Sequence, residues 1–177
     1  MPTDAQRPTF DHWLQEHAGI LHRVANGFAA GADRDMRRVL DALAGLNPKP
    51  IETLTPEEAR KQPTPADAVK ALLRQEGKSD APEPGVRVRD VQLSGPTGAI
   101  PARAYTPEGA EGQTLPMVVY YHGGGWVIAD LDTYDATPRA MAKQARAVVV
   151  SVEYRHAPEH KFPAAHDDAF AAYQRVW

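Results

Sequence analysis

The sequence predicts an α/β protein in which a helical region comes first and a sheet with flanking helices follows. Apolar residues recur every three or four positions over about the first 80 residues, a spacing typical of amphipathic helices. After Gly85 the apolar residues alternate or run together, as they do in strands. A strand, a helix and a second strand then follow one another, and this order predicts a parallel pair with a crossover helix.

Residues 1–84 are expected to form a helical cap. Two apolar faces at helical spacing are expected, the first formed by Phe10, Leu14, His17, Leu21, Val24 and Phe28, and the second by Met36, Val39, Leu40 and Leu43. Thr55-Pro56-Glu57-Glu58 has the form of a capping box with proline at the first helical position. Thr64-Pro65-Ala66-Asp67 begins a further helix in the same way.

Residues 85–177 are expected to form the sheet and its helices. Apolar positions between Val86 and Leu93 indicate one strand, and alternation between Ile100 and Tyr105 indicates a second with one buried face. The short turn between them predicts an antiparallel pair.

Three elements make up the predicted parallel unit. Leu115 to Tyr121 is a continuous apolar run, so we expect a strand that is buried on both faces. Asp135 to Arg146 is expected to be helical, and Ala147 to Val152 forms a second strand of the buried type. Pro163 then begins the last predicted helix.

Composition narrows the class of protein. The chain has 177 residues and a formal net charge of −3, so it lacks the basic excess that nucleic acids and membrane surfaces attract, and we expect neither as a partner. It contains no cysteine, which excludes disulfides, thiolate catalysis and cysteine-ligated zinc. The N-terminal residues do not resemble a secretory signal, and no apolar run is long enough to span a bilayer, so the expected location is cytoplasmic.

The most informative motif is His122-Gly123-Gly124-Gly125-Trp126, which directly follows the strand ending at Tyr121. Successive glycines permit backbone angles and a close approach that a β-carbon would forbid. One use is to turn N–H groups toward the oxygen that becomes negative in a tetrahedral intermediate, where each donor is worth roughly 3 kcal/mol. The alternatives are a plain glycine-rich turn and a phosphate-binding loop. A phosphate loop needs a helix that opens on the glycines, whereas Trp126-Val127-Ile128 intervenes here.

The residues around this loop resemble the hormone-sensitive-lipase family of bacterial esterases, which are α/β-hydrolases with an HGGG-type loop. The resemblance rests on the stretches PMVVYYHGGGWVIADLDTYD and SVEYRHAPEHKFPAAHDDAFAAYQRVW, and it extends from about Val86 to Trp177. The chain departs from the family pattern at Ala129, Tyr134 and His156, where the family often has glycine, often histidine and usually leucine. The implied fold is a truncated α/β-hydrolase sheet with an N-terminal helical cap.

The resemblance also implies roles for the residues of the loop. The N–H groups of Gly124 and Gly125 would be oxyanion donors, and a third donor would come from the residue after the nucleophile. His122, Gly123 and Trp126 would support the loop, with His122 bracing it through hydrogen bonds rather than acting as a base. No metal and no organic cofactor are expected.

Other polar residues in the chain are expected to be structural. Arg155 and Glu159 belong to the stretch Tyr154-Arg155-His156-Ala157-Pro158-Glu159 and are expected to form ion pairs that fix a bend. Asp167 and Asp168 fall in the first turns of a helix, where the helix dipole favours carboxylates; an acid–base pair or a metal site is the alternative. The histidines at positions 12, 17 and 22 are five apart, which does not place metal ligands on one helical face.

Ester hydrolysis on this fold requires a serine at a strand-to-helix elbow, with a histidine and an acid. The serines of the chain are Ser79, Ser94 and Ser151, and none of them has the flanking glycines and the preceding strand of such an elbow. We therefore expect the nucleophile, the acid and the base to lie outside these residues, and the 177-residue chain alone to be inactive.

The function implied by the resemblance is a carboxylic ester hydrolase acting on small-molecule esters with short to medium acyl chains. A non-catalytic small-molecule-binding module, or an inactive fragment of the fold, is the alternative. In the α/β-hydrolase strand order the strand at residues 116–121 pairs with the serine-bearing strand. Without that partner its edge would be exposed, so we expect oligomerisation or aggregation through this edge.

Overall fold

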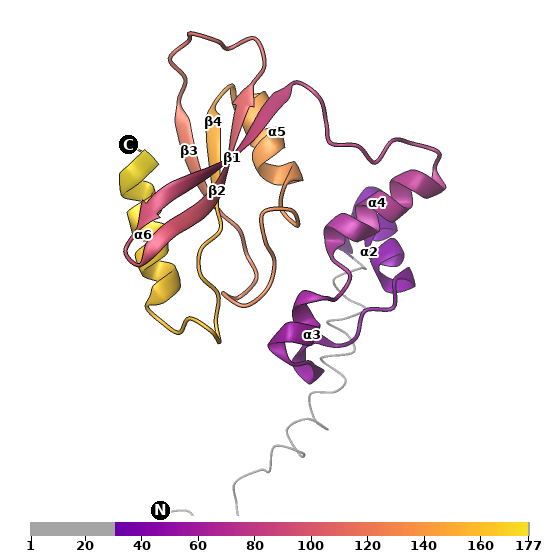
Figure 1. The fold of residues 1–177 in the computed structure, drawn as a ribbon. Helices are drawn as coiled ribbons and strands as arrows, with labels where there is room; N and C mark the ends of the chain where they lie inside the picture. Colours follow the sequence, from indigo (N-terminus) through magenta and orange to yellow (C-terminus); the bar gives the residue numbers. More distant parts are fainter. Residues whose placement is uncertain (1–30, 177) are drawn as a thin grey trace, which may run out of the picture.

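The structure is a computed structural model that describes residues 31–176 (Figure 1). Helices and a short 3-10 turn precede a four-stranded sheet that is flanked by two more helices. In chain order the elements are α2 (Arg34–Gly45), η2 (Ile51–Thr53), α3 (Pro56–Arg60), α4 (Pro65–Gln75), β1 (Val86–Gly95), β2 (Gly98–Pro107), β3 (Met117–Tyr121), α5 (Ala136–Ala145), β4 (Val148–Val152) and α6 (Ala164–Val176). The apolar face predicted between Phe10 and Phe28 lies outside the described residues.

Both predicted helix starts in the cap region are confirmed. The Thr55 hydroxyl accepts the Glu58 N–H at 3.3 Å while the Glu58 carboxylate accepts the Thr55 N–H at 2.9 Å, which completes a capping box. Thr64 and Asp67 form the same reciprocal pair at the start of α4. α2 packs against α4, but Met36 of its predicted apolar face is 51 % exposed. Within residues 31–176 no helix is both long and apolar enough to cross a membrane.

The predicted hairpin is also confirmed. β1 and β2 pair antiparallel over their full lengths, from Val86 opposite Pro107 to Gly95 opposite Gly98. The tight connection needs glycine, because Gly98 has a φ of +144° and a β-carbon on Gly95 would lie 2.5 Å from the Ile100 side chain.

The strand order of the sheet is β1-β2-β4-β3, and β3 and β4 are parallel as predicted. β4 is an inner strand that is buried on both faces. Its Val150 and Val152 pack in one cluster with Ala172 of α6, whereas Val149 packs in another with Ala142 of α5. Helices therefore cover both faces of β4, which explains its uninterrupted apolar sequence.

β3 differs from the prediction of complete burial. Its three central residues are half-buried, while Met117 is 48 % and Tyr121 37 % exposed. The reason is its position: among residues 31–176 only β4 pairs with it, so it forms an edge of the sheet.

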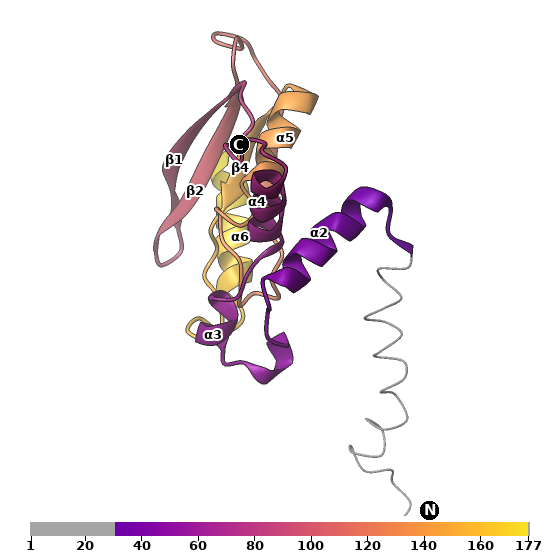
Figure 2. The ribbon, with the colours of Figure 1, turned by 90° about the vertical axis from the view of Figure 1, so that its right-hand side faces the viewer.

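The helices occupy two separate regions of the molecule. α5 and α6 lie against the sheet, whereas α2, α3 and α4 lie together to one side of it (Figure 1). The view turned by 90° places β1 and β2 at one side of the molecule and α2 at the other (Figure 2).

Candidate functional site

The loop that follows β3 has a backbone conformation that requires glycine. Gly124 has a φ of +130° and Gly125 a φ of +60°. A β-carbon on Gly124 would lie 2.0 Å from the carbonyl oxygen of Ile128, so no other residue fits there without moving the backbone. The N–H groups of Val127 and Ile128 both donate to the Gly124 carbonyl, at 3.1 and 3.0 Å, and close the turn.

Two backbone donors of this loop have no hydrogen-bond partner among the described residues. Across residues 31–176, the N–H groups of Gly124 and Gly125 take part in no backbone hydrogen bond. Successive N–H groups near positive φ angles form concave anion-binding arrangements in proteins. This arrangement can therefore accept a negatively charged oxygen.

His122 anchors the start of the loop and is 4 % exposed. Its Nδ1 lies 2.8 Å from the Gly123 carbonyl oxygen, so Nδ1 carries the hydrogen and donates it. The Tyr154 hydroxyl donates to the His122 carbonyl at 2.8 Å, and the two rings stack with centroids 4.6 Å apart. Burial lowers the pKa of His122, but the Glu153 carboxylate and the Gly123 carbonyl raise it, and the net shift of this pKa is upward.

Trp126 lies at the surface of the loop. It is 66 % exposed and has a φ of +61°, an unusual value for a residue with a side chain. Its carbonyl accepts the Ala157 N–H at 2.8 Å, which ties the loop after β3 to the segment after β4.

Two cavities flank the loop. The larger, of about 950 Å³, is lined from the cap side by residues such as Arg60 and Thr64 and from the sheet side by residues such as Gly124. The smaller, of about 630 Å³, is lined mainly by apolar groups. Its lining includes Tyr121, Gly125, Trp126, Phe162 and Ala165.

Arg60 of α3 connects the cap to both loops of the site. Its guanidinium donates to the carbonyl oxygens of Val127 and Ala157, each at 2.8 Å, and to the Glu159 carboxylate at 2.8 and 2.7 Å. These hydrogen bonds from Arg60 lower the pKa of Glu159 to about 2. The ion pair expected for Glu159 is present, and the cap supplies its partner.

The ion pair expected for Arg155 is also present, with Asp168 of α6. The guanidinium binds the two carboxylate oxygens of Asp168 in a bidentate way, at 2.8 Å each, and the Arg155 N–H adds a third bond at 3.0 Å. Asp168 is only 2 % exposed. The helix dipole that was expected to explain this carboxylate is thus secondary to a buried ion pair.

The structure brings together three residues that were not predicted to meet: His122, Glu153 and His156. Tyr121 and Val152 are opposite each other in the parallel pair β3–β4, so the next residues, His122 and Glu153, emerge side by side. His156 follows three residues later and faces the same carboxylate. The signal in the sequence was the position of His122 and Glu153, each directly after a buried strand of the predicted parallel pair.

The serines of the chain lie apart from this site. Ser151 is fully buried in β4, Ser94 lies on β1, and the hydroxyl of Ser79 accepts the Ala81 N–H at 3.2 Å. In the part of the chain that the structure describes, no serine hydroxyl is hydrogen-bonded to a histidine.

Comparisons with known proteins agree with this architecture. Residues 118–177 match a family described as having the α/β-hydrolase fold. The carboxylic ester hydrolase LipN of Mycobacterium tuberculosis is 50% identical over 96 residues, which are 54% of this chain and 24% of LipN. Esterase LipI of the same organism is 48% identical over 107 residues, which are 60% of this chain and 33% of LipI. The chain thus spans between a quarter and a third of the length of these relatives.

A solved structure extends the likeness to the cap. The structure of a hyperthermophilic esterase from the archaeon Pyrobaculum calidifontis is 38% identical, with a TM-score of 0.62. The match covers 80% of this chain and 42% of that one. From its sheet order, its family match and these relatives, the chain has the α/β-hydrolase fold and is similar to carboxylic ester hydrolases.

Proposed function

We propose that this chain supplies the oxyanion loop and the cap of a serine-dependent carboxylic ester hydrolase. The observation that carries this proposal is the pair of N–H groups at Gly124 and Gly125, which have no hydrogen-bond partner within residues 31–176 and lie in a loop that requires glycine at position 124. The nucleophile, the acid and the base are proposed to lie outside the 177 residues.

The chemistry assigns a definite task to these donors. A serine hydroxyl attacks the ester carbonyl, and the carbonyl oxygen becomes an oxyanion. The N–H groups of Gly124 and Gly125 donate to that oxygen, and the N–H of the residue after the nucleophile provides a third bond. Because these donors are fixed before the reaction, they stabilise the transition state without reorganisation, each by roughly 3 kcal/mol. Collapse of the intermediate expels the alcohol, and water then hydrolyses the acyl-enzyme.

The two cavities beside the loop favour an ester of moderate size as the substrate. The cavity of about 950 Å³ beside Gly124 falls in the range of small-molecule sites, which is roughly 300–1,000 Å³. The smaller cavity beside Gly125 has an apolar lining that suits a short to medium acyl chain. A panel of p-nitrophenyl esters of increasing acyl length tests this preference. We expect turnover to be highest for short and medium chains, and a maximum at long chains would contradict it.

A binding module that keeps the pocket without the chemistry is the second candidate, because no serine–histidine pair occurs within residues 31–176. A fluorophosphonate probe applied to the protein from its native source separates the two, since the probe modifies only an activated serine. The esterase predicts a single covalent adduct and an intact mass well above 19.3 kDa. A mass of 19.3 kDa without an adduct would favour the binding module.

A further inference from the structure

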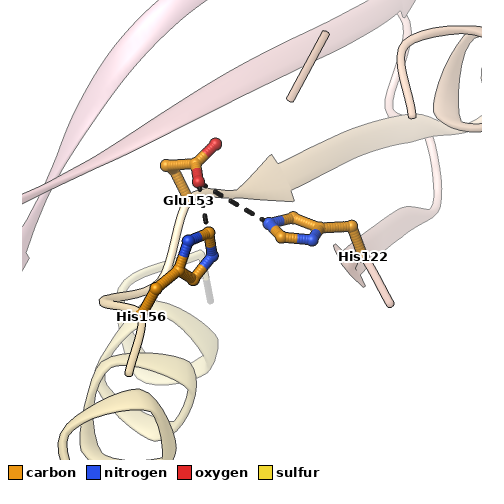
Figure 3. Close-up of side chains that lie close together, drawn as sticks. All are labelled: His122, Glu153 and His156. Carbon is orange, nitrogen blue, oxygen red and sulfur yellow. Dashed lines mark ion pairs between the residues drawn. The ribbon is translucent and has the colours of Figure 1, made fainter. Parts of the chain in front are cut away.

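The side chains of His122, Glu153 and His156 lie close together (Figure 3), and Glu153 and His156 line the larger cavity. The Nε2 atoms of His122 and His156 lie 3.7 and 3.6 Å from the same oxygen of Glu153. One ligand atom from each of the three side chains lies within 4.8 Å of the others. The carboxylate thus stands between two imidazoles.

Both imidazole nitrogens that face this point have no hydrogen-bond partner. His122 Nε2 and His156 Nε2 are buried and unbonded, and the side chain of His122 is completely inaccessible to solvent. Buried polar atoms are rarely left in this state, so each such case requires an explanation. At 3.6 to 3.7 Å the Glu153 oxygen is beyond normal hydrogen-bonding distance of either nitrogen.

The orientation of each group is fixed by a second contact. His122 donates from Nδ1 to the Gly123 carbonyl at 2.8 Å, so its neutral form directs the Nε2 lone pair toward Glu153. The second oxygen of Glu153 accepts the Leu131 N–H at 2.9 Å, which leaves the first oxygen for the imidazoles. An imidazole lone pair that faces a carboxylate is unfavourable unless a proton or a metal cation lies between them.

We propose that His122 Nε2, His156 Nε2 and the Glu153 carboxylate form a binding site for a divalent transition-metal ion of the zinc type. Two imidazoles and one carboxylate match the preferences of zinc, whereas magnesium and calcium favour sites made of oxygen ligands. Tetrahedral zinc with bonds of about 2.0–2.1 Å places its ligand atoms roughly 3.3 Å apart. The 3.6 and 3.7 Å separations from the Glu153 oxygen need only a small contraction to reach this geometry, and all three ligand atoms lie within 4.8 Å of one another, so the two imidazoles must also move closer together on binding. The contact of His122 with Gly123 is the outer-shell bond that metal-binding histidines commonly make.

The bound ion would join two loops of the site. His122 directly precedes the glycine loop after β3, whereas Glu153 and His156 belong to the segment after β4. A fourth ligand, water or a solute, would enter from the larger cavity, which Glu153 and His156 both line. His122 is 31 residues from Glu153, so no local sequence pattern marks the three residues as a metal site.

Calorimetric titration of Zn²⁺ into the metal-free 177-residue chain tests the proposal, because binding needs no catalytic serine and is thus independent of the proposed esterase activity. We expect one Zn²⁺ per chain. His156→Leu should weaken this binding by more than the roughly 10- to 100-fold that loss of an outer-shell partner costs. His160→Leu is the matched control in the same segment, because His160 lies outside the cluster. This variant should bind Zn²⁺ with the affinity of the wild-type chain.

Two further variants make the result unambiguous. Glu153→Gln keeps the size of the side chain and its acceptor for the Leu131 N–H but removes the charged ligand, so it should also lose Zn²⁺ binding while circular dichroism shows an intact fold. Replacing His12, His17 and His22 together by alanine should leave Zn²⁺ binding intact. The proposal is overturned if the wild-type chain shows no saturable binding, if both His156→Leu and Glu153→Gln bind as well as wild type, or if the triple variant abolishes binding.

Discussion

Asp168 and Glu159 are carboxylates of neighbouring segments, and each is paired with an arginine in a different environment. Asp168 is 2 % exposed and accepts three hydrogen bonds from Arg155, whereas the Glu159 side chain is 55 % exposed beside Arg60. The sequence indicated that Arg155 and Glu159 form ion pairs, but their partners depend on which elements pack together. Arg60 is 99 residues from Glu159, and no local pattern links them.

Loss of the buried ion pair between Arg155 and Asp168 is expected to destabilise the fold strongly. Asp168→Ala leaves the Arg155 guanidinium without its carboxylate in a partly buried place, and such losses cost about 3 kcal/mol or more. The free energy of unfolding from urea denaturation of the 177-residue chain measures this effect. The exposed neighbour Asp167 provides the control, because Asp167→Ala should change stability by less than about 0.5 kcal/mol. Equal effects of the two substitutions would contradict this assignment.

The pair between Arg60 and Glu159 is expected to weaken in acid. Arg60 lowers the pKa of Glu159 from 4.5 to about 2 in the folded state, so the stabilisation is complete above the unfolded value and is lost as pH falls toward about 2. Wild type should be more stable than Glu159→Gln at pH 7, and the difference should shrink as pH falls below about 4.5 and become small near pH 2. Thermal unfolding of both proteins across this range provides the measurement. Equal stability of the two proteins at pH 7, or a difference that is already lost at pH 4.5, would contradict the lowered pKa.

At the level of elements, the strands and helices within residues 31–176 follow the expected order closely. Local signals specify them: the capping threonines at α3 and α4, the hairpin glycines, and the apolar runs of β3 and β4. The two runs look alike in sequence, yet β4 is an inner strand and β3 an edge. Burial depends on neighbours that lie far away in the chain, so composition alone could not distinguish them.

The capping box of α4 makes a prediction for a single element. Thr64→Ala removes the hydroxyl that accepts the Asp67 N–H, and loss of an N-cap side chain costs about 1 kcal/mol. Thr64→Ser retains the hydroxyl and should recover most of this loss. Urea denaturation of the two variants provides the comparison, and indistinguishable stabilities would show that the capping bond contributes little.

For the whole molecule, the exposed edge of β3 is the feature with the widest consequence. Unpaired backbone groups beside exposed apolar side chains favour association with other strands. Met117 and Tyr121 of β3 are 48 and 37 % exposed. We therefore propose that the 177-residue chain self-associates through β3.

Light scattering after size-exclusion chromatography tests this self-association. Met117→Lys adds a charge at the edge strand and should shift the chain toward the monomer. Met141→Lys is the matched control, because Met141 is 40 % exposed but lies on α5, away from the edge. A monomeric wild-type chain, or an equal shift by both substitutions, would argue against association through β3.

Some features of the candidate site depend on local sequence, whereas others depend on contacts between residues that are far apart in the chain. The glycine loop could be recognised from five consecutive residues, because its backbone conformation is a local property. The cluster of His122, Glu153 and His156 could not, because it depends on the alignment of β3 with β4. The hydrogen bond from Arg60 to the Val127 carbonyl depends further on the position of α3 relative to the sheet.

The proposed oxyanion role of Gly124 is tested most directly by ester hydrolysis in a protein that includes the serine-bearing segment. Gly124→Ala places a β-carbon 2.0 Å from the Ile128 carbonyl oxygen, so the loop must move and its two N–H donors with it. Gly109→Ala is the control for backbone strain, because Gly109 also has a positive φ, +71°, but has open space around it and lies in a turn after β2. We predict that kcat falls roughly 100-fold or more in Gly124→Ala and stays near the wild-type value in Gly109→Ala, with both proteins folded. Near-normal turnover in a folded Gly124→Ala protein would contradict the account.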